Sequence, residues 1–81
     1  MARVFFPEHL TQYTNGTREL DTNASSFREL LAVLERTFPG IEARIVGKVA
    51  VAIDGDIIHD PFLDPIGPQS EVYFLHRIEG G

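Results

Sequence analysis

The stretch SSFRELLAVLERTFPG, residues 25–40, decides the fold. Ser26 and Glu29 form the S-x-x-E pattern of a capping box, in which each side chain satisfies the other residue's free backbone N–H. Pro39 and Gly40 then end the helix. The apolar residues between these signals recur at helical spacing and form one stripe: Phe27, Leu30, Leu31, Leu34 and Phe38. This stripe must be buried, and a sheet is the only other candidate element that could cover it.

A second apolar segment follows the helix and predicts the centre of that sheet. The segment 49–53 reads VAVAI, which is typical of a strand buried on both faces or nearly so. Asp54 and Gly55 predict a tight turn, and the segment 56–58 can return from it as a short strand. The preceding segment 41–48 is expected to be a connector.

The last strand is predicted over residues 71–78, after a proline-rich loop at 59–70. Alternate side chains of a strand point to opposite faces of its sheet. The two faces consist of Val72, Phe74, His76 and Ile78 on one side, and Tyr73, Leu75 and Arg77 on the other. We expect the first face to meet the helix, so that Tyr73 and Leu75 form an exposed apolar patch on the opposite side.

The residues before the helix predict a hairpin. Residues 2–6 are rich in strand formers, residues 8–16 are polar and turn-like, and residues 17–22 are expected to return as a second strand. The predicted order is strand, strand, helix, strand, short strand, strand. We therefore expect an α+β fold, in which one main helix packs on a mixed four- to five-stranded sheet.

The composition restricts the chemistry of this 81-residue chain, which is expected to be one domain. Its 12 acidic residues against 7 lysines and arginines give a net charge of −5, which disfavours nucleic acid as a partner. It has no cysteine, and therefore no disulfide, thiolate metal site or cysteine nucleophile. No segment approaches the ~20 apolar residues of a membrane span, and the start lacks the apolar run of a signal peptide. We expect a cytoplasmic protein that binds neither nucleic acid nor membrane.

No group of residues has the spacing of a catalytic or metal site. His9, His59 and His76 lack metal-ligand spacing, and the aspartates between residues 54 and 64 lack the late glutamate of a calcium loop. The sequence has neither a Gly-x-Ser-x-Gly elbow nor a phosphate-binding glycine loop. We therefore predict that the chain is not an enzyme and binds no metal or cofactor of its own.

The element order, the length and the terminal Gly80 and Gly81 together resemble the β-grasp fold of ubiquitin-like proteins. More narrowly, the sequence resembles the MoaD/ThiS family of sulfur carrier proteins. The similarity spans nearly the whole chain, and the segments that carry it are 27–31 in the helix, 38–41 at its exit, 49–55 in the apolar strand and its turn, and 71–81 at the end.

This resemblance implies a function for the end of the chain. A partner enzyme, a ubiquitin-activating-enzyme-like adenylyltransferase of the MoeB/ThiF type, would use ATP to adenylate the Gly81 carboxylate. A sulfur donor would then displace AMP and leave a thiocarboxylate. That sulfur would pass to a biosynthetic enzyme that makes molybdopterin, thiamine, cysteine or a related metabolite. Gly80 and Gly81 suit this chemistry, because a segment without Cβ atoms can thread a narrow channel.

The same resemblance divides the chain into a β-grasp domain, residues 1–78, and a flexible C-terminal tail, residues 79–81. Residues at the end of the last strand and the start of the tail are expected to dock on the activating enzyme. They are Tyr73, Leu75, Arg77, Ile78 and Glu79.

Three other functions remain open at this point. A ubiquitin-like modifier would use the activated Gly81 to form isopeptide bonds with lysines. A non-catalytic β-grasp interaction module would not use its terminal glycines at all. A small enzyme is the fourth hypothesis, but no acid–base or nucleophile constellation supports it.

Overall fold

The structure is a computed structural model, and it describes residues 1–58 and 61–76. Its elements follow one another as β1 (Ala2–Phe5), the 3-10 helix η1 (Glu8–Tyr13), β2 (Glu19–Thr22), α1 (Phe27–Thr37), α2 (Glu42–Ile45), β3 (Val49–Ile53), β4 (Asp56–Ile58) and β5 (Glu71–His76). None of the helices in these ranges is both long and apolar enough to cross a membrane.

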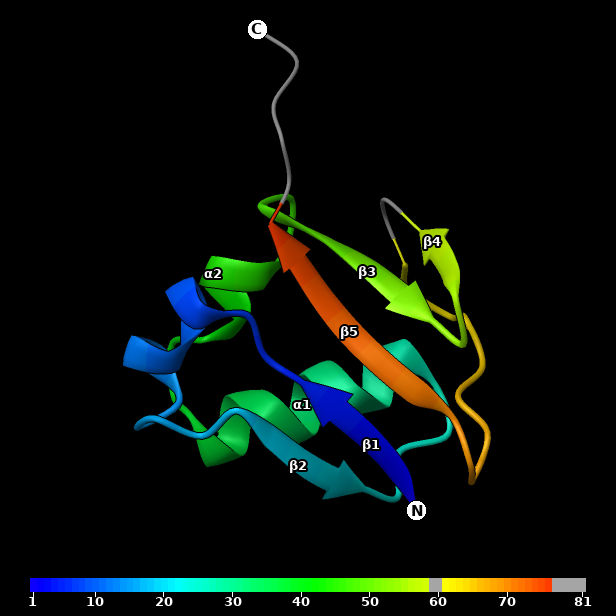
Figure 1. Cartoon of the computed structure of the whole chain (residues 1–81). Helices are drawn as coiled ribbons and strands as arrows, with labels where there is room; N and C mark the ends of the chain where they lie inside the picture. The colour runs from blue at the N-terminus through cyan, green and yellow to red at the C-terminus, as the bar shows by residue number, and fades with distance from the viewer. Residues whose placement is uncertain (59–60, 77–81) are drawn as a thin grey trace, which may run out of the picture.

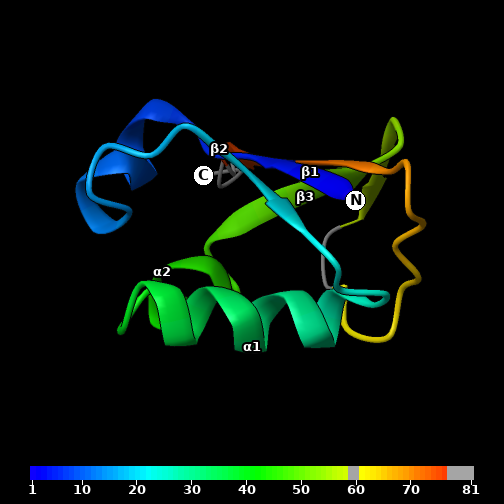
Figure 2. The ribbon, with the colours of Figure 1, turned by 90° about the horizontal axis from the view of Figure 1, so that it is seen from below.

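The five strands form one mixed sheet (Figure 1), and α1 and α2 lie on the same side of it (Figure 2). The strand order is β2-β1-β5-β3-β4. β1 and β5 run parallel, and the other neighbouring strands run antiparallel. The view from below shows two layers, the sheet and α1 (Figure 2). The predicted α+β architecture, with one main helix on a mixed sheet, is confirmed.

The core lies between α1 and the inner face of the sheet. Val4 of β1, Leu34 of α1 and Val72 of β5 are fully buried there. The ring of Phe74 stacks on that of Phe6, with centroids 5.7 Å apart, and it meets the ring of Phe27 edge-on at 6.1 Å. The helical stripe predicted from the sequence therefore packs against the predicted inner face of β5.

The N-terminus of α1 differs from the predicted capping box by one residue. Ser26 Oγ accepts a hydrogen bond of 3.2 Å from the backbone N–H of Glu29, as predicted. Glu29 Oε2 accepts instead from the backbone N–H of Ser25, at 2.7 Å, and from Ser25 Oγ, at 2.9 Å. These bonds lower the pKa of Glu29, the backbone hydrogen bond being the larger cause.

Two helical segments were not predicted. Residues 8–16 contain η1, and the connector 41–48 contains α2. Each of these two helices buries one aliphatic side chain in the core, since Leu10 of η1 and Ile45 of α2 are each only 2% exposed. Both helices are a few residues long, so they lack the repeated spacing that reveals a longer helix.

Candidate functional site

Two of the seven residues predicted for the site, Tyr73 and Leu75, lie on β5 within the described part of the chain. β5 is the middle strand of the sheet, between β1 and β3, and its last described residue, His76, pairs with Val49. Five residues of the sequence follow His76. The predicted strand end at residues 77–78, the tail 79–81 and five predicted site residues fall outside the described residues, namely Arg77, Ile78, Glu79, Gly80 and Gly81.

An apolar row crosses the face of the sheet that is opposite to α1. Phe5 of β1 pairs with Tyr73 of β5, and Tyr73 pairs on its other side with Ala52 of β3. Ala52 in turn pairs with Ile57 of β4. These four side chains share one face, because residues paired across neighbouring strands point to the same side. We refer to Phe5, Tyr73, Ala52 and Ile57 as the outer row.

The outer row contains a stacked pair of aromatic rings and two large side chains that remain exposed. The rings of Phe5 and Tyr73 stack with their planes 9° apart and their centroids at 4.4 Å. Tyr73 is still 39% exposed and Ile57 is 62% exposed, whereas Ala52 is small and buried. The row is therefore a shallow apolar surface with one large side chain on each side of the alanine.

The predicted docking residues Tyr73 and Leu75 both lie on this outer face. Leu75 is half-buried and pairs with Ala50 of β3, one step from the outer row towards the end of β5. α1 and α2 lie on the other side of the sheet in Figure 2. An exposed apolar surface of this kind often marks a site of protein–protein interaction. The structure thus brings together the two docking residues that it describes.

Acidic residues border the outer row on the side of β1 and β2. Glu19 pairs with Phe5, and Arg3 pairs with Asp21 on one side and with Glu71 on the other. The Arg3 guanidinium donates a hydrogen bond of 3.2 Å to Asp21, which raises the pKa of Arg3 together with the charges of Asp21, Glu19 and Glu71. Three carboxylates against one guanidinium give this border a net negative charge, which suits a basic partner surface.

Asp54 fixes the position at which β5 begins. Its Oδ2 atom accepts a hydrogen bond of 2.6 Å from Ser70 Oγ, and its Oδ1 atom accepts one of 3.0 Å from the backbone N–H of Glu71. Its own backbone N–H donates to the Glu71 carbonyl at 3.0 Å. The two bonds to the carboxylate lower the pKa of Asp54, the one from Ser70 being the larger cause. This contact stabilises the register that places Tyr73 in the outer row.

The predicted turn at Asp54 and Gly55 is confirmed. Both residues have positive φ angles, of 50° and 88°, as the tightest hairpin turns require. The sequence predicts Asp54 as a turn residue only, and it does not reveal the contact with Ser70. These two residues are 16 positions apart, and only the pairing of β3 with β5 brings them together.

Only two of six residues in the apolar surface were predicted from the sequence. Phe5, Ala50, Ala52 and Ile57 join Tyr73 and Leu75 on the outer face. The alternation within residues 2–6 and 49–53 indicates which side chains of each strand share a face. It does not indicate which strands are neighbours in the sheet. Within residues 1–58 and 61–76, no three His, Asp or Glu side chains are placed to hold a metal ion together.

Comparison with known proteins shows similarity in structure alone. No protein-family description and no curated protein sequence matches the chain significantly. A solved chain of the BexX/CysO complex of Amycolatopsis orientalis superimposes with a TM-score of 0.87 and 18% identity, covering 100% of both chains. CysO of Mycobacterium tuberculosis gives a TM-score of 0.85 with 16% identity, covering 96% of this chain and 100% of its own.

A third similar structure is small archaeal modifier protein 1 of Methanosarcina acetivorans. It gives a TM-score of 0.77 with 20% identity, and the match covers 99% of this chain and 95% of that protein. TM-scores this high establish a shared fold, whereas identities this low leave the activity open. The predicted fold is therefore confirmed, and the chain has the β-grasp fold that CysO and this archaeal modifier share.

Proposed function

We propose that the chain is a sulfur carrier whose Gly81 carboxylate is activated by a partner enzyme. One observation carries this proposal: β5, the central strand, leads directly to a five-residue segment that ends in two glycines. Tyr73 of the outer row lies on this strand, so a partner that binds the row would also lie close to that segment. A carrier with this layout supplies the reacting group, and the partner supplies the catalytic machinery.

The proposed chemistry has two steps. In the first, a Gly81 carboxylate oxygen attacks the α-phosphorus of ATP and displaces pyrophosphate, which gives an acyl adenylate. In the second, hydrosulfide attacks the carbonyl carbon and displaces AMP, which leaves a thiocarboxylate. Adenylation is needed because a free carboxylate has no good leaving group. The partner would bind ATP with its metal ion and stabilise the charge that develops on phosphorus.

The outer face is the proposed docking surface for this activating enzyme, an adenylyltransferase of the MoeB/ThiF type. Tyr73 and Leu75 would contact it directly, and Arg77, Ile78 and Glu79 would follow into its channel. The acidic border at Glu19 and Asp21 would face basic residues of the enzyme. The solved BexX/CysO complex supports this proposal, since a chain with this fold there has a protein partner. A biosynthetic enzyme that accepts the sulfur is the second proposed partner, and the cytoplasm, where ATP is available, is the proposed location.

Intact-mass spectrometry tests this function. The full chain would be incubated with ATP, a MoeB/ThiF-type enzyme and sulfide. We expect the mass to rise by the exchange of one oxygen for one sulfur, and fragmentation to place the change at Gly81. As a control, the same enzyme would be incubated with its own carrier protein. If that carrier is converted and the mass of this chain does not change, the proposal is contradicted.

A second candidate function is protein modification through isopeptide bonds. The observation that favours it is the structural similarity to an archaeal protein named as a modifier. Both candidates use the same adenylate, and they differ in the nucleophile that attacks it. Adducts in which Gly81 is joined to a lysine of another protein would support modification, whereas a thiocarboxylate without such adducts supports sulfur transfer.

A further inference from the structure

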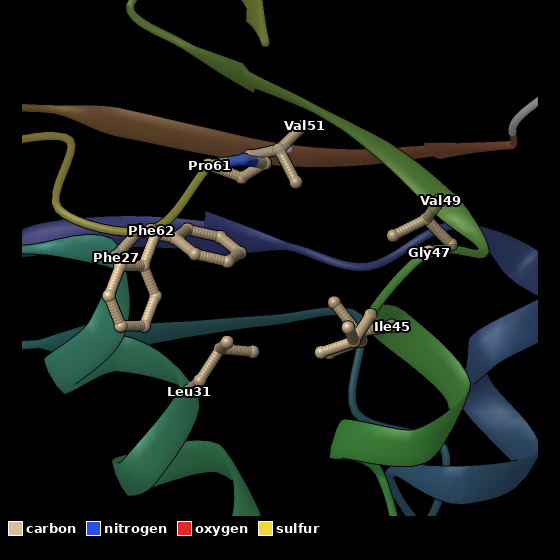
Figure 3. Close-up of a pocket in the computed structure, with 9 residues that line it drawn as sticks. Phe27, Leu31, Ile45, Gly47, Val49, Val51, Pro61 and Phe62 are labelled. Atoms are coloured by element: carbon tan, nitrogen blue, oxygen red, sulfur yellow. The ribbon is translucent and has the colours of Figure 1, made fainter. Parts of the chain in front are cut away.

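A second apolar site lies on the helix side of the sheet. A cavity of about 230 Å³ opens there between α1, α2, β3 and the segment at residues 61–62. Leu31 of α1, Ile45 of α2 and Phe62 point into the same space, below Val49 and Val51 of β3 (Figure 3). Every residue that lines this cavity is apolar or glycine. The cavity is therefore suited to an apolar group.

The size of the cavity restricts its occupant. An engineered apolar cavity of about 150 Å³ holds benzene, whereas pockets for drug-sized molecules start near 300 Å³. At about 230 Å³, the cavity lies between these limits. One large side chain, such as that of phenylalanine, leucine or methionine, fits this range better than a cofactor or metabolite does.

The rim of the cavity is also apolar. Val46 and Phe62 both line the cavity and are 57% and 56% exposed, although large apolar side chains are usually buried. An inserted side chain would cover both of them and exclude water from the contact. This arrangement, a central pocket within an apolar ring, is typical of the residues that dominate binding between proteins.

The cavity wall at Phe62 is already fixed. The backbone carbonyl of Phe62 accepts a hydrogen bond of 2.8 Å from the backbone N–H of Arg28, in the first turn of α1. Its own N–H donates to Asp64 Oδ1 at 3.1 Å. Because the backbone is held from both sides, a ligand would not have to order this segment, which lowers the entropic cost of binding.

The charges next to the cavity point to an acidic partner. Among the described residues that adjoin a lining residue in sequence, the charged ones are all basic: Arg28, Arg44 and Lys48. They outnumber the carboxylate of Asp64, which contacts a lining residue at the Phe62 N–H. The Arg28 guanidinium lies 5.7 Å from the centroid of the Phe62 ring, and the Arg44 guanidinium lies over Tyr13. This basic setting contrasts with the net charge of −5 of the whole chain. An acidic segment would be attracted to it.

The cavity also lies close to the point where the described part of β5 ends. Val49 lines the cavity and pairs with His76, the last described residue of β5. The outer row and the cavity lie on opposite faces of the same sheet. A protein that holds the tail is therefore placed to reach the cavity without displacing a partner from the outer row.

We propose that this cavity is a second docking point, which takes one large apolar side chain from an acidic segment of the protein that receives the tail. The identity of that protein rests on the function proposed above, whereas the binding itself does not. A carrier must meet an activating enzyme and an acceptor in turn. Separate docking sites on the two faces of the sheet would allow the carrier to bind the activating enzyme at one site and the acceptor at the other.

The test is a titration of the full ¹⁵N-labelled chain, followed by NMR, with the peptide acetyl-DEFED-amide. The alanine peptide acetyl-DEAED-amide is the control, because it keeps the charges and removes the ring. We expect saturable amide shifts gathered at Leu31, Val46, Gly47 and Val49 with the first peptide and none there with the second. Absent shifts, or equal shifts with both peptides, would overturn the proposal.

Matched variants locate the binding site. Val46→Asp places a carboxylate on the rim and should weaken binding by about tenfold or more. Ile57→Asp makes the same kind of change at a residue that is 62% exposed on the outer face, and it should bind as the wild type does. Phe62→Ser is a second rim variant in case Val46→Asp does not fold. Equal affinity of the folded rim variant and the wild type would rule out the cavity.

The same titration separates this proposal from the proposed function. A chain that lacks Gly80 and Gly81 should bind the phenylalanine peptide as the full chain does, because the assay requires no activation. Thiocarboxylate formation without peptide binding would refute the docking site alone. Peptide binding without thiocarboxylate formation would refute the sulfur-carrier function alone.

Discussion

The rings of Phe5 and Tyr73 stack across the two parallel strands of the sheet, with their centroids 4.4 Å apart. The contact joins the first strand of the chain to the last one. Stacked aromatic pairs contribute about 0.5–1.5 kcal/mol beyond the area that they bury. Because Phe5 supports one side of the ring, Tyr73 presents a rigid surface that loses little conformational entropy when a partner binds it.

Replacement of Tyr73 by alanine should therefore impair activation of the chain. The variant loses the largest rigid side chain at the centre of the outer row. We expect kcat/KM for thiocarboxylate formation, measured with a MoeB/ThiF-type enzyme, to fall by about tenfold or more. Urea unfolding of the same sample would show how much of Tyr73→Ala acts through stability.

Leu63→Ala is the matched control for that experiment. Leu63 is 67% exposed, and it lies in the loop after β4, away from the outer row. Its loss should leave kcat/KM within a factor of about two, as expected of a surface change outside an interface. An equal decrease in both variants would contradict a docking role for the outer row.

The terminal glycine should be sensitive to side-chain size. Gly81→Val adds a branched side chain beside the reacting carboxylate, and a channel built for a chain without Cβ atoms would exclude it. We expect no detectable adenylate or thiocarboxylate by mass spectrometry, with an unchanged urea midpoint. Full conversion of Gly81→Val by the same enzyme would show that the end of the chain does not enter such a channel.

The main elements of the fold could be predicted because their patterns are long. The stripe from Phe27 to Phe38 spans three turns, and it is buried as expected. β5 spans Glu71–His76, and within it Val72 and Phe74 are buried while Tyr73 is exposed. In both elements, apolar residues recur in the sequence at the spacing that places them on one face, and that face packs on the core.

The outer row and the cavity could not be predicted because both combine distant segments. Phe5, Tyr73 and Ile57 come from three strands, and their common row depends on the strand order. The cavity depends on α2, whose four residues are too few to show a period. Its other wall, at Phe62, lies in a loop whose path is set by hydrogen bonds to the start of α1.

Truncation of a core residue should cost far more stability than loss of a surface charge on the same helix. Leu34 is fully buried in α1, and Leu34→Ala should lower the free energy of unfolding by about 2–5 kcal/mol. Arg36 is exposed, and Arg36→Ala should change it by about 0.5 kcal/mol or less. Chemical denaturation followed by circular dichroism measures both values. Equal values for the two variants would contradict the packing described for α1.

The contact between Asp54 and Ser70 should make stability depend on pH. The hydrogen bonds that Asp54 accepts lower its pKa in the folded chain below the ordinary value of about 3.9. The charged carboxylate therefore stabilises the fold above that ordinary value, and this contribution is lost as the pH falls through the lowered pKa. Glu29 and Glu35 also have lowered pKa values, so the wild type alone does not isolate Asp54.

Comparison with Asp54→Asn isolates this carboxylate. Asparagine tolerates the positive φ of 50° and nearly keeps the shape of aspartate, but it cannot ionise. We expect the urea midpoint of the variant to lie below that of the wild type at about pH 7, and the difference to shrink as the pH falls below about 4. Ser70→Ala removes the donor from the other side and should show the same trend. A difference that stays constant from about pH 7 to about pH 3 would show that the charge of Asp54 does not stabilise the start of β5.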